Sequence, residues 1–168
     1  MKPFEKILVA IDYSENSNYA FNYALELAKQ FNGELTLMHV IHEPVDMARI
    51  LFPYLSYEQL ENAIMEDGAK MMEKFCTEQM GGFINYKTAV AKGIPYQEIV
   101  RKSQETGATL LVIGTHGYTG VDHLIFGSTA ERVVRSASCP VLTIRLPVRE
   151  EFSEDIPAGE KTIKETKV

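Results

Sequence analysis

A glycine-rich stretch in the second half of the chain has the residue types that bind phosphate. Residues 110–129, LLVIGTHGYTGVDHLIFGST, begin as an apolar run and follow the spacing G-x2-G-x9-G-S-T. The candidate ligand-binding residues are Gly114, Gly117, Gly127, Ser128 and Thr129. A glycine that leaves a strand can adopt positive φ and lets backbone N–H groups approach a ligand closely. The Gly-Ser-Thr step lies where a helix is expected to begin, and the free N–H groups and dipole of a helix start favour an anion. This pattern predicts a phosphate site, and the two hydroxyls can also contact the water shell of a metal ion.

A structural interpretation of the same stretch remains open. The glycines can simply form a loop, and Ser128 can cap the following helix with Glu131 as its capping-box partner. The spacing is neither the dinucleotide G-x-G-x-x-G nor the P-loop G-x4-G-K-S/T, and the turn contains no lysine.

The elements that would position these residues follow from hydrophobic periodicity. Short apolar runs predict strands at residues 6–11, 34–41, 85–91, 109–113 and 141–145. Four helical stretches separate them: one that ends before Gly33 as C-cap, one from Ser56 with Gln59 in a capping box, one from Pro95 to Gly107, and one from Ser128 to about Ala137. This alternation predicts an α/β fold, a parallel sheet with helices on both faces.

Helical spacing also predicts which faces are buried. In the first helix the apolar face comprises Ala20, Ala24, Leu27, Ala28 and Phe31. In the second it comprises Leu60, Ile64, Met71 and Phe75. We expect both faces to pack against the sheet.

The glycine pattern and the segment 9–15, Val-Ala-Ile-Asp-Tyr-Ser-Glu, together resemble the ATP-binding branch of the universal stress protein family. The resemblance extends over about residues 1–146. It implies a Rossmann-like sheet of five parallel strands in the order 3-2-1-4-5, with the ligand at the reversal between strands one and four. It also implies ATP as ligand, with Mg²⁺ or Mn²⁺ held through the phosphates and Ser128 as a candidate metal contact.

The loop after the first strand would face the glycine motif in that order. Asp12 matches a family aspartate that accepts hydrogen bonds from ribose hydroxyls; its alternative role is a helix N-cap with Glu15. The resemblance places Ala10 and Ile11, through their main chain, and Val40 around the adenine. Their alternative role is plain strand core.

Histidines and cysteines are weaker candidates for ligand-binding or metal-binding residues. His39 and His42, three apart on a strand, should point to opposite faces, which argues against a shared zinc site. His116 lies in the glycine turn and is either a donor to the ligand or a solvated loop residue. Cys76 and Cys139 are expected to be reduced core residues.

Composition limits the class of protein. With 168 residues, 45% of them hydrophobic, the chain fits one globular domain at residues 1–146. The tail 147–168 mixes both charges with few apolar residues and is predicted to be disordered. A net charge of −6 argues against nucleic acid and anionic membranes as partners. The five apolar residues 7–11 are too few for a signal peptide or membrane span, so we expect a cytoplasmic protein.

These residues are compatible with three classes of function. A nucleotide-dependent regulatory protein of stress responses is preferred, with an unidentified protein partner, no catalytic residue and at most slow ATP hydrolysis. An ATP-using enzyme, an ATPase or nucleotidyl transferase, is the alternative, although the turn after the first strand lacks the paired histidines of transferases. A phosphoaccepting receiver domain is disfavoured. It needs an aspartate after the third strand, where this chain has Ala91-Lys92-Gly93, and a lysine after the fifth strand, where it has Arg145.

Two further segments carry expectations about partners. The fifth strand, 141–145, is an uncharged edge until Arg145, and family members pair this strand antiparallel across a two-fold axis, which implies a homodimer. The alternative is that the tail covers the edge and leaves a monomer. The long segment 42–55 is either a lid, a partner-binding loop or simple packing over the sheet.

Overall fold

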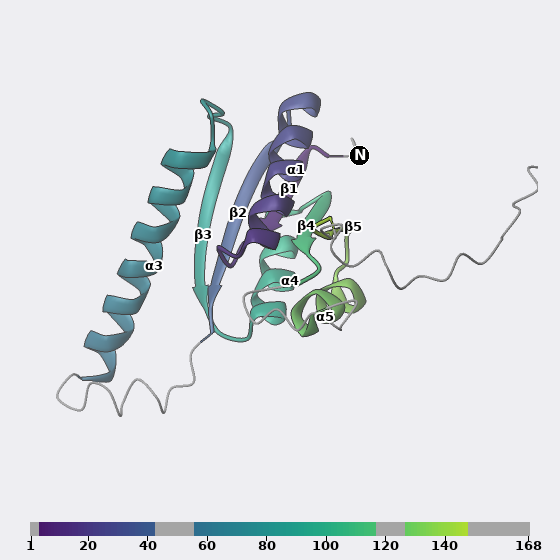
Figure 1. Ribbon diagram of the computed structural model, residues 1–168. Coiled ribbons are helices and arrows are strands. Elements are labelled where there is room, and N and C mark those ends of the chain that lie inside the picture. The colour runs from purple at the N-terminus through teal and green to yellow at the C-terminus, as the bar shows by residue number, and fades with distance from the viewer. Residues whose placement is uncertain (1–3, 43–55, 117–126, 148–168) are drawn as a thin grey trace, which may run out of the picture.

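The fold is an open α/β sheet covered by helices on both faces (Figure 1). The computed structural model describes residues 4–42, 56–116 and 127–147. Its elements are β1 (Lys6–Ala10), α1 (Glu15–Phe31), β2 (Glu34–Ile41), α3 (Tyr57–Gln79), β3 (Tyr86–Lys92), α4 (Pro95–Thr106), β4 (Leu110–Gly114), α5 (Ser128–Ser136) and β5 (Val141–Ile144). The five strands pair in parallel in the order β3-β2-β1-β4-β5. The predicted fold class and strand order are confirmed.

The central strand β1 explains why the sheet forms. Its residues from Ile7 to Ala10 are all buried, as expected for a parallel strand covered on both faces. Ala10 pairs with Met38 of β2 on one side and with Ile113 of β4 on the other. The carboxyl ends of these three strands therefore meet at one edge of the sheet.

Alternating side chains of β1 supply the two halves of the core. Val9 packs with Phe21 of α1 and Phe75 of α3 on one face. Leu8 packs with Ile99 of α4 and Val133 of α5 on the other face. Because successive strand residues point to opposite sides, one short strand contributes to both cores.

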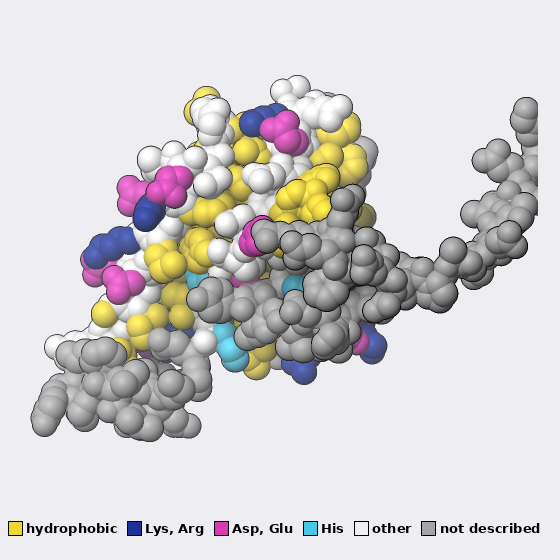
Figure 2. Space-filling view, viewed as in Figure 1, with side chains coloured by type: hydrophobic (Ala, Val, Ile, Leu, Met, Phe, Trp, Pro, Cys, Tyr) yellow, Lys and Arg dark blue, Asp and Glu magenta, His cyan; other side chains and the backbone are white. Residues whose placement is uncertain are grey.

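The helix α3 covers β3 and β2 near one edge of the sheet (Figure 1). Its outer side carries charges of both signs next to one another (Figure 2), including the pairs Lys70–Glu66 at 2.8 Å and Lys74–Glu78 at 3.9 Å. The predicted Ser56–Gln59 capping box is present at its start. The predicted buried face is wrong at Met71, which is 51% exposed, because Met72 takes the buried position at 2%.

The end of α1 differs from the prediction. Asn32, not Gly33, adopts the left-handed conformation that ends the helix, with φ 52°. Gly33 is required for a different reason: a Cβ there would lie 2.3 Å from the carbonyl oxygen of Phe4. Phe31 is 48% exposed and stacks on Phe4 at 4.8 Å instead of entering the core.

The prediction for the two cysteines is confirmed, and several other predicted features lie largely outside the described residues. Cys76 and Cys139 are free thiols, and burial raises the pKa of both. Of the helices that the structure describes, none is both long enough and apolar enough for a membrane span. The predicted segment 42–55 falls outside the described ranges except for His42, the predicted tail 147–168 does so except for Pro147, and Gly117 also lies outside them.

Candidate functional site

One pocket lies at the sheet edge where β1, β2 and β4 end, with a volume of about 290 Å³. It is lined by every predicted site residue that the structure describes: Ala10, Ile11, Asp12, Val40, Gly114, Gly127, Ser128 and Thr129. The fold brings these residues together from the ends of β1, β2 and β4 and from the start of α5, as expected at a reversal of strand order.

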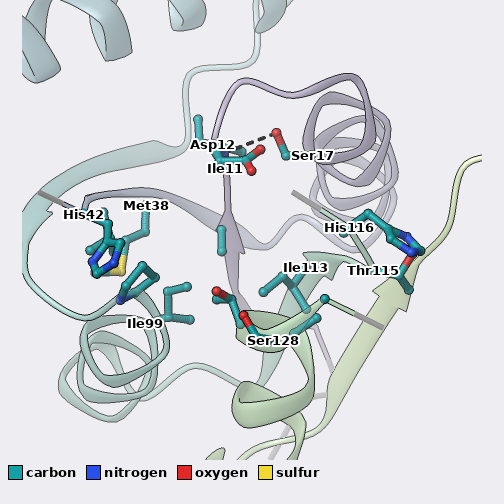
Figure 3. Close-up of a pocket in the computed structure, with 17 residues that line it drawn as sticks. Ile11, Asp12, Ser17, Met38, His42, Ile99, Ile113, Thr115, His116 and Ser128 are labelled. Atoms are coloured by element: carbon teal, nitrogen blue, oxygen red, sulfur yellow. Dashed lines mark hydrogen bonds between the residues drawn. The ribbon is translucent and has the colours of Figure 1, made fainter. Parts of the chain in front are cut away.

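The two sides of the pocket differ in chemistry. Figure 3 shows Met38, His42 and Ile99 on one side and Thr115 and His116 on the other, with Asp12 and Ser128 between them. We call the first the apolar side, formed by Met38, Val40, Pro95 and Ile99 with His42 at its margin, and the second the polar side, formed by Thr115, His116 and the start of α5 with Ser128 and Thr129. No lysine or arginine is found among the described lining residues.

The turn after β1 is stabilised by hydrogen bonds between near neighbours. The Ser14 N–H and hydroxyl both donate to Asp12 Oδ1, at 3.0 and 2.5 Å. Ser14 Oγ accepts from the Ser17 N–H at 3.2 Å, and Ser17 Oγ accepts from the Asp12 N–H at 3.2 Å. Ser14 is therefore the N-cap of α1, and the alternative that assigned this role to Asp12 with Glu15 is wrong.

The main chain of Ile11 is already engaged on both sides. Its N–H donates to Met38 O at 2.8 Å, and its carbonyl lies 2.9 Å from His39 Nδ1. Because a carbonyl can only accept, His39 donates at Nδ1. A ligand could thus reach the Ile11 main chain only through the second lone pair of this carbonyl.

Tyr13 occupies a strained position beside the pocket. Its φ is +63°, its ring stacks against His39 at 4.6 Å, and its hydroxyl is buried without a hydrogen-bond partner among the described residues. Burial raises the pKa of the Tyr13 phenol to about 12, with a smaller contribution from Cys76. The phenol is neutral throughout the physiological range.

His42 differs from its neighbour His39 in what it contacts. It lines the pocket, and its Nδ1 lies 3.4 Å from the carbonyl of Gly93. The two histidines therefore bind different carbonyls, and the described residues contain no cluster of three or more potential metal-ligating side chains.

The turn after β4 is held by partners far along the chain. The Thr115 N–H donates to the carbonyl of Ile144 in β5 at 2.8 Å. The Gly127 N–H donates to Thr115 O at 2.7 Å, which joins the two ends of the glycine-rich segment. The Thr115 hydroxyl lies 3.0 Å from His116 Nδ1, so this predicted candidate contacts its neighbour in the turn.

The start of α5 opens into the pocket, with a different cap from the one predicted. Gly127 is the N-cap, with φ −70° and ψ 152° and no side-chain capping bond, and Ser128 is the first helical residue. The Ser128–Glu131 capping box is therefore wrong; Glu131 pairs with Arg135 at 2.8 Å. The exposed Ser128 hydroxyl and the unpaired N–H groups expected in a first helical turn are available at the polar side.

Gly114 has a packing role that the sequence did not reveal. A Cβ on it would lie 2.9 Å from the side-chain amide of Asn16 and 3.2 Å from the Asn16 carbonyl. Its φ is not in the positive range, so close packing of α1 explains this glycine, not a strained turn.

Sequence reasoning missed several residues that form or support the pocket. Met38, Pro95, Ile99 and Ile113 line it, and buried Asn16 lies behind it. Asn16 had a detectable signal: it lies one helical turn before the buried Ala20 and so shares its inward face.

Comparisons with known proteins agree with this architecture. Residues 3–145 match the family model described as "Universal stress protein family". Universal stress protein YxiE of Bacillus subtilis is 32% identical over 147 residues, which cover 84% of this chain and 99% of that protein. Universal stress protein MJ0531 of Methanocaldococcus jannaschii is 32% identical over 155 residues, 88% of this chain and 85% of that protein.

Solved structures show the same similarity. That of hypothetical protein MJ0577, from Methanocaldococcus jannaschii, superposes with a TM-score of 0.75 at 26% identity and covers 88% of this chain and all of that one. Universal stress protein UspA from Lactobacillus plantarum superposes with a TM-score of 0.67 at 28% identity, with 86% and 100% covered.

Proposed function

Because the chain belongs to the universal stress protein family, we propose that its pocket binds an adenine nucleotide, ATP first, and that the protein regulates stress responses through this bound state. The observation that carries the proposal is the two-sided pocket, with a carboxylate between an apolar side and a helix start. A nucleotide has the same order of parts: apolar base, hydroxylated ribose, anionic phosphates.

The apolar side suits a purine base. Met38, Val40 and Ile99 offer aliphatic surface for its faces, and Ala10 is small enough to let a planar ring lie close to the sheet. Base edges would then form hydrogen bonds with main-chain groups at the strand ends.

Asp12 suits the ribose. Its carboxylate lies at the end of β1 and lines the pocket, and a carboxylate can accept hydrogen bonds from two neighbouring hydroxyls. Because Asp12 Oδ1 also accepts hydrogen bonds from Ser14, the turn fixes the orientation of the Asp12 side chain before a ligand binds.

The polar side suits phosphates accompanied by a cation. The first turn of α5 supplies N–H groups and the positive end of a helix dipole. The lining has no Lys or Arg among its described residues, so Mg²⁺ or Mn²⁺ held by the phosphates would neutralise them, with the Ser128 hydroxyl as candidate contact. Such hard cations favour oxygen ligands and keep several waters.

Calorimetric titration tests the proposal. ATP with Mg²⁺ should bind the purified, nucleotide-free protein, adenosine should bind more weakly, and GTP should bind more weakly than ATP. Mass spectrometry of the nucleotide released on denaturation identifies the ligand carried from cells. Failure of ATP, ADP, AMP and cyclic AMP to bind would refute the proposal.

Hydrolysis should be slow under this proposal. No P-loop lysine lies near the described polar side, and His116 is engaged with Thr115 in the turn. A phosphate-release assay should give turnover far below the enzyme range of roughly 1–10³ per second. Several turnovers per second would favour the alternative, an ATP-using enzyme.

The proposal includes assembly through β5 and a cytoplasmic location. The edge residues Val141, Leu142, Thr143 and Ile144 are all half-buried and uncharged. Leu142 and Ile144 pack against the core, so Thr143→Lys is the better probe of the edge itself.

Light scattering should show a dimer that the Thr143→Lys substitution shifts towards monomer, whereas Thr88→Lys on the opposite edge strand β3 should leave the dimer unchanged. Removing the tail 147–168 should also change nothing; dimerisation only after its removal would make the tail an edge cover. Cell fractionation checks the location.

A further inference from the structure

We propose that Asn16 is the positioning residue that fixes the polar side of the pocket to the edge strand β5. The inference rests on the proposed function, because it assigns phosphate binding to the polar side. Asn16 itself does not line the pocket, so it would act through the groups it holds.

Asn16 is a buried polar side chain with a specific pair of partners. It lies in the first turn of α1 and is only 7% exposed. With the amide nitrogen towards Ile144 O at 3.1 Å and the amide oxygen towards His116 N at 3.2 Å, both groups are satisfied. Carbonyls only accept and backbone N–H groups only donate, so these two partners determine the amide orientation.

The partners of Asn16 belong to one connected set of hydrogen bonds. The carbonyl of Ile144 also accepts from the Thr115 N–H, and the carbonyl of Thr115 accepts from the Gly127 N–H. Asn16 thus joins α1 to β5 and to the residue that follows Thr115, while Thr115 continues the connection to the start of α5. These bonds fix where the helix N–H groups face the pocket.

Gly114 supports the same assignment from the opposite side. A methyl group at this position would lie 2.9 Å from the Asn16 amide, a contact closer than real side chains make. The absence of a side chain on Gly114 is therefore what admits the Asn16 amide between α1 and the end of β4.

The apolar side is built by other elements. Met38 and Val40 come from β2, and Ile99 comes from α4. None of these residues belongs to the hydrogen bonds around Asn16. Loss of Asn16 should therefore weaken the binding of phosphates more than the binding of a nucleoside.

The test compares ATP and adenosine in matched variants. Asn16→Leu removes both side-chain hydrogen bonds at similar volume, and we expect about 10-fold weaker ATP binding with adenosine changed less than about 2-fold. Asn16→Asp keeps an acceptor for the His116 N–H but sets a second acceptor against the Ile144 carbonyl and adds a negative charge near the polar side, so its ATP loss should be at least as large as that of Asn16→Leu. Asn22→Leu, at an exposed position of the same helix, is the control and should change neither ligand.

Amide hydrogen exchange gives a second measurement that needs no ligand. In Asn16→Leu the His116 amide should exchange faster than in the wild type, whereas Asn16→Asp should retain its protection. A parallel loss for ATP and adenosine, or an unchanged His116 amide in Asn16→Leu, would overturn the positioning role. If the wild type binds neither ligand, the proposed function fails separately, and the exchange result alone decides the role of Asn16.

Discussion

The turns that follow β1 and β4 lie side by side at the pocket but are stabilised in different ways. The β1 turn is fixed by Asp12, Ser14 and Ser17, which bond to one another within six residues of chain. In the β4 turn, the Thr115 N–H donates to the Ile144 carbonyl, and the Thr115 carbonyl accepts from the Gly127 N–H. Neighbouring strands place both turns at the same edge of the sheet.

This difference separates what can be changed locally from what cannot. A substitution of Ser14 or Ser17 should alter mainly that turn and the ribose region, because the hydrogen bonds described among Asp12, Ser14 and Ser17 stay within the turn. A substitution in the β4 turn should also act on α1 or β5, because its bonds lead there. The following predictions test this contrast.

The largest expected effect is on ATP binding at the far end of the β4 turn. Gly127→Leu places a side chain in the pocket at the start of α5 and should weaken ATP binding about 100-fold or more, roughly 2.7 kcal/mol. The φ of Gly127 is −70°, which suits any residue, so the positive φ that a glycine would permit is not used here and folding should be preserved. Titration calorimetry measures the loss, with Ser136→Leu at the exposed end of the same helix as control. Equal ATP affinity in both variants would remove Gly127 from the site.

A smaller loss is expected in the β1 turn. Asp12→Ala should weaken ATP and adenosine alike, by about 10- to 100-fold or 1.5–3 kcal/mol, because both ligands contain the ribose. The substitution also removes the acceptor for Ser14, so the melting temperature should fall slightly. A loss confined to ATP would place Asp12 near the phosphates and contradict the ribose assignment.

Protein stability should report the start of the β4 turn most directly. Gly114→Ala forces a methyl group against Asn16 and should lower the free energy of unfolding by about 1–3 kcal/mol. For a domain of this size that is about 2–10 °C in melting temperature. Chemical denaturation measures the loss in the free energy of unfolding.

In the double variant with Asn16→Ala, the loss of stability should be smaller than the sum of the two single losses, because one substitution makes room for the other. Strict additivity would show that the two residues do not interact.

The smallest effect is expected at Tyr13 in the β1 turn. Tyr13→Phe removes a buried hydroxyl that lacks a described partner and keeps the ring contacts with His39 and Phe75, so stability should stay equal or rise by up to about 1 kcal/mol. The pKa of the folded phenol is about 12, above its ordinary value of 10.0, so the folded state holds this proton more tightly than the unfolded state. The wild type should lose stability as pH rises from about 10 to about 12, and Tyr13→Phe should lack this part of the loss. Denaturation across that pH range checks it; a marked loss of stability at neutral pH would reveal a partner for the hydroxyl.

Features with a short repeat or a short span were predictable from the sequence. Strand and helix positions follow from periodicities of 2 and 3.6 residues, and the Ser56–Gln59 capping box depends on four consecutive residues alone. The strand order came from family resemblance, and parallel pairing then brought the predicted site residues to one pocket. Even here local competition mattered: Ser14 caps α1 in place of Asp12, and Asn32 ends it in place of Gly33.

The sequence by itself determined the elements, the α/β class and the residue types around the pocket. Only the tertiary structure decided that Asn16 joins His116 to Ile144, that Gly114 makes room for it, and that Gly127 needs no unusual backbone conformation. The physical reason is distance along the chain. Turn bonds and helix caps involve residues that are already neighbours before folding, whereas the Asn16 bonds exist only after α1, β4 and β5 have packed together.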